Sequence, residues 1–103
     1  MIKVIVLYPN REDTKFDMDY YLHHHIPLVS KLAGAALKGV TVERGLAGQA
    51  PGSPPAFAVI CNLLFDSVEA FQASFGPHAQ EIMDDIPRYT DSIPTVQISE
   101  VKL

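Results

Sequence analysis

Apolar and β-branched residues gather in four stretches of the chain, each bounded by residues that favour turns, which is typical of strands. The predicted strands are Ile2–Tyr8, Leu37–Arg44, Ala56–Phe65 and Ile93–Leu103. The segment 45–55, between the second and third of them, is rich in Gly, Pro, Ala and Ser and predicts a loop. The stretches between the other strands have the spacing of helices.

The first predicted helix runs from Met18 to about Ala33. Asp17 has the chemistry of an N-cap, and Phe16 and Tyr21 are spaced to form a hydrophobic staple. Pro27 is expected to bend or restart the helix, because proline lacks an N–H donor and clashes with the preceding turn. Gly34 is a suitable stop.

The second predicted helix begins at 66–69, where Asp66 and Glu69 have the spacing of a capping box. Gly76-Pro77 interrupts it, and because proline suits the first turn of a helix we expect a restart that runs through Asp84. Ile86-Pro87 then ends the helix.

The resulting order, βαββαβ, predicts a single α+β domain over residues 1–103 with a four-stranded antiparallel sheet of the ferredoxin-like type. Helices in this topology cover one face of the sheet. The first strand nevertheless carries apolar residues on both faces, such as Val4 and Val6 on one and Ile5 and Leu7 on the other. A second copy packed on the open face is the simplest cover, so we expect a homodimer through the sheets. The alternative is that the loop 45–55 folds over the sheet.

The amino-acid composition argues against several classes of function. Apolar residues make up 48% of the chain and charged residues 19%, with a net charge of −4. The eight Lys and Arg are scattered, which argues against nucleic acid or an anionic membrane as partner. No apolar run approaches the roughly 18 residues of a membrane span. With one cysteine, Cys61, and no signal-peptide pattern at the start, we expect a cytoplasmic protein.

Three consecutive histidines, 23–25, suggest a metal site at first sight. Helix geometry argues against one, because successive residues turn by about 100° and do not face each other. On the helix, His25 falls on one apolar stripe with Tyr21, Leu22, Val29 and Leu32, while the other two histidines point to solvent. We therefore expect no metal, and no motif indicates any other cofactor.

His25 and His78 are the candidate catalytic residues. An inward-facing His25 is either a structural histidine bonded to a carbonyl or a tyrosine hydroxyl, or the proton-transferring group of a pocket. His78 follows Gly76-Pro77 at a helix start, where the helix dipole disfavours the imidazolium, so it is either a neutral base or an exposed first-turn residue.

Aromatic residues are the candidate ligand contacts. Tyr8, Tyr21 and Tyr89 offer hydroxyl donors on apolar rings, although such tyrosines are also common as half-buried packing residues. Phe57, at the start of the third strand, is the fourth expected ligand-binding residue. Cys61 lies mid-strand among apolar neighbours and indicates a small core residue rather than a nucleophile.

Two segments together resemble the EthD family, named for ethyl tert-butyl ether degradation. The first is residues 16–29, in which Tyr21, His25 and Pro27-Leu28 form the pattern Tyr, three residues, His, one residue, Pro-Leu. The second is residues 82–90, which continues to Pro94 and Gln97. Arg88 departs from the asparagine-like residue expected in the Pro-x-Tyr-Thr element. The resemblance covers nearly the whole chain.

The resemblance implies a dimeric α/β-barrel, in which two ferredoxin-like subunits pack sheet to sheet. The wider superfamily includes polyketide cyclases, cofactor-free monooxygenases, lactone isomerases and haem enzymes, with a ligand cleft between the sheet and the helices. The family's histidine corresponds to His25 of this chain.

Three functions follow as hypotheses. The first is an enzyme of a degradative or secondary-metabolite pathway, a cyclase, isomerase or cofactor-free oxygenase, with His25 as acid/base on a small hydrophobic or aromatic molecule. The second is a non-catalytic accessory protein that binds such a molecule. The third is a haem-binding protein with His25 or His78 as the iron ligand.

Overall fold

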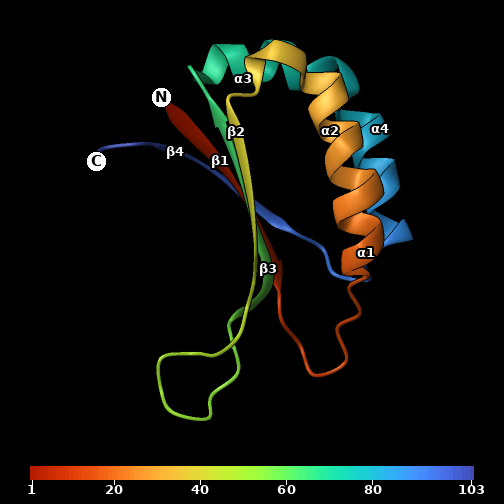
Figure 1. The fold of residues 1–103 in the computed structure, drawn as a ribbon, viewed down its shortest axis with the longest axis vertical. Helices are drawn as coiled ribbons and strands as arrows, with labels where there is room; N and C mark the ends of the chain where they lie inside the picture. The colour runs from red at the N-terminus through yellow and green to blue at the C-terminus, as the bar shows by residue number, and fades with distance from the viewer.

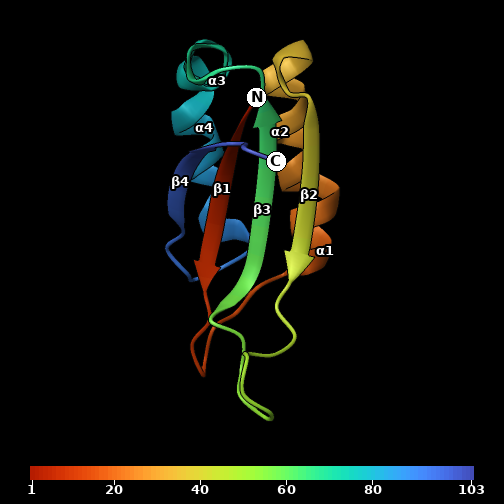
Figure 2. The same cartoon turned by 90° about the vertical axis from the view of Figure 1, so that its left-hand side faces the viewer.

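Four antiparallel strands form one sheet in the order β2-β3-β1-β4. In this computed structural model, which describes residues 1–103, the strands are β1 (Ile2–Pro9), β2 (Gly39–Arg44), β3 (Phe57–Phe65) and β4 (Thr95–Glu100). Helices cover one face of the sheet and leave the other open (Figure 1). Figure 2 looks onto the open face, with β4 and β2 at its two edges. The predicted α+β, ferredoxin-like order is confirmed.

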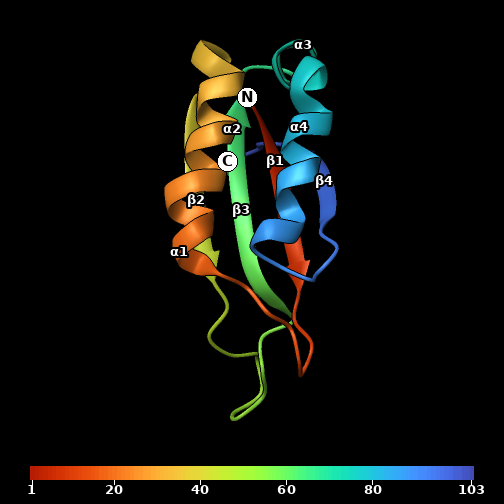
Figure 3. The same ribbon diagram turned by 90° about the vertical axis from the view of Figure 1, so that its right-hand side faces the viewer.

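The helical layer consists of two arms that lie side by side across the sheet (Figure 3). The first arm contains α1 (Met18–Tyr20), a π-helical turn (Tyr21–His25) and α2 (Ile26–Ala33). The second arm contains α3 (Val68–Phe75) and α4 (Ala79–Asp85), joined by a 3₁₀ turn. No helix has the length and apolar character that crossing a membrane requires.

The ends of the first arm are those predicted. The Asp17 carboxylate accepts a hydrogen bond from the backbone N–H of Tyr20 at 3.1 Å, which is the expected N-cap. The rings of Phe16 and Tyr21 pack edge to face, with centroids 4.9 Å apart. The arm stops at Gly34, where φ is +64°, a conformation that glycine adopts without strain.

Pro27 restarts the first arm through the π-helical turn. The N–H of Ile26 bonds to the carbonyl of Tyr21, five residues back, so the helix is wider immediately before the proline. Pro27 is the second residue of α2, directly after the wider turn, and supplies no N–H to the helix. One side chain of the predicted apolar stripe differs in burial from the prediction. Leu22, predicted on the buried stripe, is 42% exposed, whereas His25 is only 4% exposed.

The second arm begins one residue later than predicted. Ser67, not Asp66, caps α3, because its Oγ accepts a hydrogen bond from the N–H of Ala70 at 3.0 Å. The predicted interruption at Gly76-Pro77 is confirmed as a 3₁₀ turn. The helix then resumes through Asp85 and is followed by a 3₁₀ turn from Ile86 to Arg88.

Three strands are shorter than predicted, and β4 shows the reason. It begins at Thr95 rather than Ile93, since Pro94 has no N–H to give to the ladder. It ends at Glu100 because the partner strand β1 begins at Ile2, with which Glu100 pairs. The second strand starts at Gly39 rather than Leu37, and the third starts one residue later than predicted.

The two faces of the sheet differ in burial. Val4, Tyr8, Val59 and Phe65 point under the helical arms and are at most 2% exposed. On the open face, Ile5, Leu7, Ile60 and Leu64 are half-buried by one another, and the polar residues of β4 share this face. The loop 45–55 extends past the end of the sheet rather than across the open face (Figures 1 and 2). The loop therefore does not cover the open face of the sheet.

Candidate functional site

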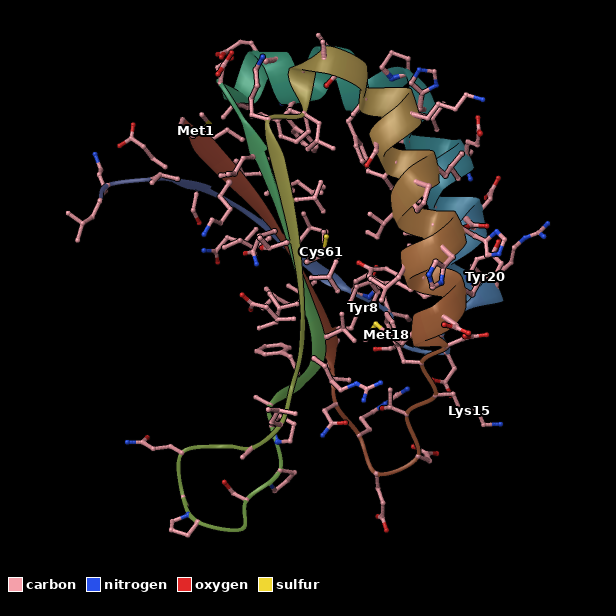
Figure 4. The ribbon with its side chains drawn as sticks, in the orientation of Figure 1. Met1, Tyr8, Lys15, Met18, Tyr20 and Cys61 are labelled. Atoms are coloured by element: carbon pink, nitrogen blue, oxygen red, sulfur yellow. The ribbon has the colours of Figure 1, made fainter.

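A cavity of about 510 Å³ lies between the sheet and the helical arms. Its sheet side is formed by Val6, Tyr8 and Cys61, and its helical side by Tyr21, His25 and Ile82. Figure 4 shows Tyr8 and Cys61 pointing from the sheet toward the helices. The strand β4 and the end of α4 form the rim, where Met83, Ile93 and Val96 are exposed. The lining of the cavity is thus predominantly apolar.

His25 is held at the cavity wall by hydrogen bonds to both ring nitrogens. Its Nδ1 lies 2.9 Å from Oδ2 of Asp85, and its Nε2 lies 3.3 Å from the hydroxyl of Tyr89. A carboxylate only accepts, so Nδ1 carries the proton and donates to Asp85. In the neutral ring Nε2 is then the acceptor, and Tyr89 donates to it. Asp85 therefore fixes the tautomer in which Nε2 can take a proton.

Tyr8 extends this hydrogen-bond chain to the cavity. The hydroxyls of Tyr8 and Tyr89 are 2.7 Å apart and both rings are nearly fully buried. Because Tyr89 donates to Nε2 of His25, its oxygen accepts from Tyr8. The ring of Phe16 packs edge to face on both tyrosines, with centroids 5.1 and 5.3 Å away. The chain from Tyr8 through Tyr89 to His25 is thus held rigidly by aromatic packing.

Asp85 connects the buried imidazole to the surface. The hydroxyl of Tyr20 donates to its Oδ1 at 2.7 Å, and Nε of Arg88 lies 3.7 Å from the same oxygen. Figure 4 shows Tyr20 on the side of the helical layer away from the sheet. Asp85 also borders a polar surface hollow that Arg88, Asp84 and Glu81 line. The carboxylate therefore lies between the apolar cavity on one side and water on the other.

Burial and hydrogen bonding set the charge states of this pair. Burial lowers the pKa of His25 below its ordinary value, although Asp85 partly opposes the shift. For Asp85, burial raises the pKa, but the hydrogen bonds from Tyr20 and His25 outweigh it and the net pKa is lowered. At neutral pH the pair is thus a neutral imidazole beside a carboxylate, which is the base form of the dyad.

Burial also raises the pKa of Tyr8, Tyr21 and Tyr89, so all three hydroxyls stay protonated at neutral pH and serve as donors. The pKa of the Cys61 thiol is raised for the same reason. Cys61 is thus an unactivated thiol in the cavity wall, in agreement with its assignment as a core residue.

The structure brings together most, but not all, of the predicted site residues. Tyr8, Tyr21 and His25 line the cavity, and Tyr89 lies behind its wall, bonded to both Tyr8 and His25. His78 lies at the opposite end of α4 from Asp85 and does not line the cavity. Phe57 does not line it either, because β3 has an irregularity where Tyr8 pairs with Val59 and Pro9 with Phe57. His23 and His24 are exposed, as predicted.

Asp85 and Tyr20 are the site residues that sequence reasoning missed. Asp85 is 60 positions from His25, so no local spacing relates them. A signal exists nonetheless, because Asp85 follows the buried Ile82 by three residues and thus shares its inward helix face. An acidic residue on such a face requires a buried partner.

The geometry of the site also determines whether its residues could bind a metal ion or a haem. Nowhere do three or more His, Cys, Asp or Glu side chains come together at ligand distances. A haem iron bound by His25 would need Nε2, which already faces the hydroxyl of Tyr89 at 3.3 Å. His78, the other proposed iron ligand, lies outside the cavity. The residues of the cavity therefore do not fit a haem.

Comparisons with solved structures find close relatives of the whole fold. An EthD-like protein from Ralstonia eutropha JMP134 is 48% identical, with a TM-score of 0.95 over 99% of this chain and 92% of that one. An EthD family protein from Bacillus halodurans C-125 is 24% identical, with a TM-score of 0.74 over 99% of both chains. A ferredoxin-like protein of unknown function from Thermobifida fusca YX, described as dimeric, is 18% identical and covers 97% of this chain and 90% of its own, with a TM-score of 0.57.

No curated protein matches the chain. The model of the EthD domain matches residues 11–93, which include both segments of the resemblance and the whole His25–Asp85–Tyr89 cluster. Since this match spans most of the sequence, the chain belongs to the EthD family.

Proposed function

We propose that the protein is an acid/base catalyst for a small, largely apolar molecule bound in the cavity. The observation that carries this proposal is the 2.9 Å hydrogen bond between Nδ1 of His25 and Asp85 at the wall of an apolar cavity. A histidine that only filled the core would not need a carboxylate partner. A histidine that accepts protons gains from one, because the carboxylate stabilises the imidazolium that forms.

The proposed step is abstraction of a proton from a carbon next to a carbonyl group. The C–H bond breaks, its electron pair moves to the carbonyl oxygen as an enolate, and the proton reaches Nε2 of His25. The route runs through two hydroxyls, because the single lone pair of Nε2 already accepts from Tyr89: Tyr8 takes the substrate proton as it passes its own to Tyr89, and Tyr89 passes its proton to Nε2. Return of the proton to another atom completes an isomerisation, and attack of the enolate on a second carbonyl completes a cyclisation. Reaction of the enolate with O₂ would begin an oxygenation.

A second candidate is an accessory protein that binds the same class of molecule without changing it. The apolar cavity supports both candidates equally. The dyad favours the catalyst, because a binding protein has no use for a neutral imidazole with a fixed tautomer.

We also infer that two copies pack through their open sheet faces. Ile5, Leu7, Ile60 and Leu64 form an apolar patch on this face that nothing within the chain covers. The same face carries the polar row of β4 at one edge, which gives the patch a polar rim. A protein with the same fold from Thermobifida fusca YX is described as dimeric, which supports the inference.

The proposed catalysis is tested with 2-tetralone, an apolar ketone small enough for the cavity, in deuterated buffer. Proton NMR follows loss of the signal from the carbon next to the carbonyl. We expect the protein to accelerate this exchange and His25→Gln to lower the acceleration by about 100-fold or more, the usual contribution of a positioned base. His23→Gln, a change at an exposed histidine two residues away, should leave the rate unchanged.

Two results would contradict the catalytic proposal. One is full activity in His25→Gln. The other is a wild-type protein that binds 2-tetralone without accelerating exchange, which would favour the accessory role instead.

A further inference from the structure

The hydroxyl of Tyr21 is a polar group of the cavity that the proton-transfer chain does not use. Tyr21 is 1% exposed and lines the cavity. Its ring stacks on His25 with centroids 5.4 Å apart, so the hydroxyl is held in a fixed place. Its polar neighbours are Tyr8 and Cys61. The Tyr8 hydroxyl donates to Tyr89 and its oxygen can still accept from Tyr21, but this contact and the one to the Cys61 thiol are longer or less well aligned than the bond between Tyr8 and Tyr89.

This hydroxyl lies at the cavity wall, where Tyr8 and Cys61 satisfy it only weakly. It forms no hydrogen bond of standard length and angle within the chain. Every side-chain nitrogen or oxygen that is wholly inaccessible to solvent does have a hydrogen-bond partner. The Tyr21 oxygen is consequently accessible to a small probe, and the accessible space beside it is the cavity that Tyr21 lines. A buried donor whose partners within the chain are weak gains from a ligand or water that accepts a better hydrogen bond. Its position thus marks where a ligand's acceptor would lie.

The charges around the cavity restrict the chemical class of the ligand further. No Lys or Arg lines it, and the one acidic residue on its wall is Asp91, an exposed residue near the rim. A carboxylate, phosphate or nucleotide would lose its hydration in such a cavity without gaining a cationic partner. A neutral group that accepts one hydrogen bond meets no such penalty. The wall beyond the tyrosines is apolar and suits a hydrocarbon or aromatic frame.

We propose that the cavity selects a neutral, largely apolar molecule with one ketone-type oxygen, and that the Tyr21 hydroxyl donates a hydrogen bond to that oxygen. This inference deepens the proposed function and rests on it for the identification of the cavity as the site of chemistry. Tyr21 then binds the oxygen on which enolate charge develops, while His25 receives the proton. Such a division places the donor and the base on one helical turn, four residues apart.

The test compares the binding of three molecules of similar shape by titration calorimetry or NMR shift: 2-tetralone, tetralin and tetralin-2-carboxylate. We expect the wild-type protein to bind the ketone about 3- to 10-fold more tightly than the hydrocarbon, the usual gain from one neutral hydrogen bond. The carboxylate should bind more weakly than either. Tyr21→Phe should remove the advantage of the ketone and leave tetralin binding unchanged. Ser74→Ala, which removes a hydroxyl that bonds within α3 and does not line the cavity, is the control.

The proposal is overturned if the carboxylate binds as tightly as the ketone, or if the ketone keeps its advantage in Tyr21→Phe. Equal losses for ketone and hydrocarbon in that variant would show a packing role and would overturn it as well. The comparison of ligands on the wild-type protein needs no variant to fold. Ligand binding is measured independently of proton exchange. A preference for the ketone that depends on Tyr21, in a protein that does not accelerate proton exchange, would refute the catalytic proposal and support this one.

Discussion

Replacing Asp85 by asparagine is expected to lower the rate of 2-tetralone proton exchange by about 10²- to 10⁴-fold, the range typical of acid/base catalysis. The amide has nearly the same shape but no charge, so it cannot stabilise an imidazolium on His25. Its NH₂ group can also donate to Nδ1, which would leave the proton on Nε2 and remove the acceptor. Binding of the ketone should not change, since Asp85 does not line the cavity. The loss should thus appear in kcat rather than in affinity.

Asp84→Asn is the matched control for this variant. Asp84 precedes Asp85 directly, is exposed, and accepts a hydrogen bond from Gln80 at 2.7 Å on the outer side of α4. The same chemical change at this position should leave exchange within about twofold of the wild-type rate. An Asp85→Asn protein that folds, binds the ketone and exchanges at the wild-type rate would show that the carboxylate has no part in catalysis.

Leu7→Glu is expected to convert a dimer into monomers, with a dissociation constant at least about 100-fold weaker. Leu7 lies on the open sheet face, opposite Ile60 and Thr95 in the ladders. A two-fold interface would bury one new carboxylate from each copy, and no cation among its ladder partners compensates. In the monomer the side chain is half-exposed, so the variant should still fold. Light scattering coupled to size exclusion measures the mass.

Gln72→Glu introduces the same charge at an exposed position of α3, on the helical side of the molecule, and should leave the mass unchanged. A wild-type protein that is monomeric at all concentrations would contradict the sheet-packed dimer. So would a Leu7→Glu variant that stays dimeric, because the interface would then lie elsewhere.

Local chemistry made much of the fold predictable. The Asp17 cap and the stop at Gly34 depend on residues within one turn of the helix end, so the sequence alone identifies them. The exposure of Leu22 was not predictable in this way. Leu22 follows Tyr21 directly and lies about 100° further round the helix, at the edge of the apolar stripe, so its burial depends on how far the neighbouring elements reach.

The site was predictable only in part, because its parts come from distant segments. His25, Tyr21, Tyr8 and Tyr89 were identified from residue type and helix face. Their connection through hydrogen bonds, and the role of Asp85, depend on the packing of α4 against the first helical arm. His78 has the same chemistry as His25, but it lies at the start of α4 and does not line the cavity.

The central claim is that Asp85 holds His25 as a neutral base with its proton on Nδ1. The most direct measurement is a long-range ¹H–¹⁵N NMR spectrum of the histidine side chains, recorded while pH is lowered from neutral. The account predicts the Nδ1–H tautomer for His25 and a pKa below the ordinary histidine value, because burial disfavours the imidazolium. Asp85→Asn should remove the preference for Nδ1–H, because the amide can donate to Nδ1 as well as accept from it. An Nε2–H tautomer, or a His25 that is already charged at neutral pH, would contradict the account.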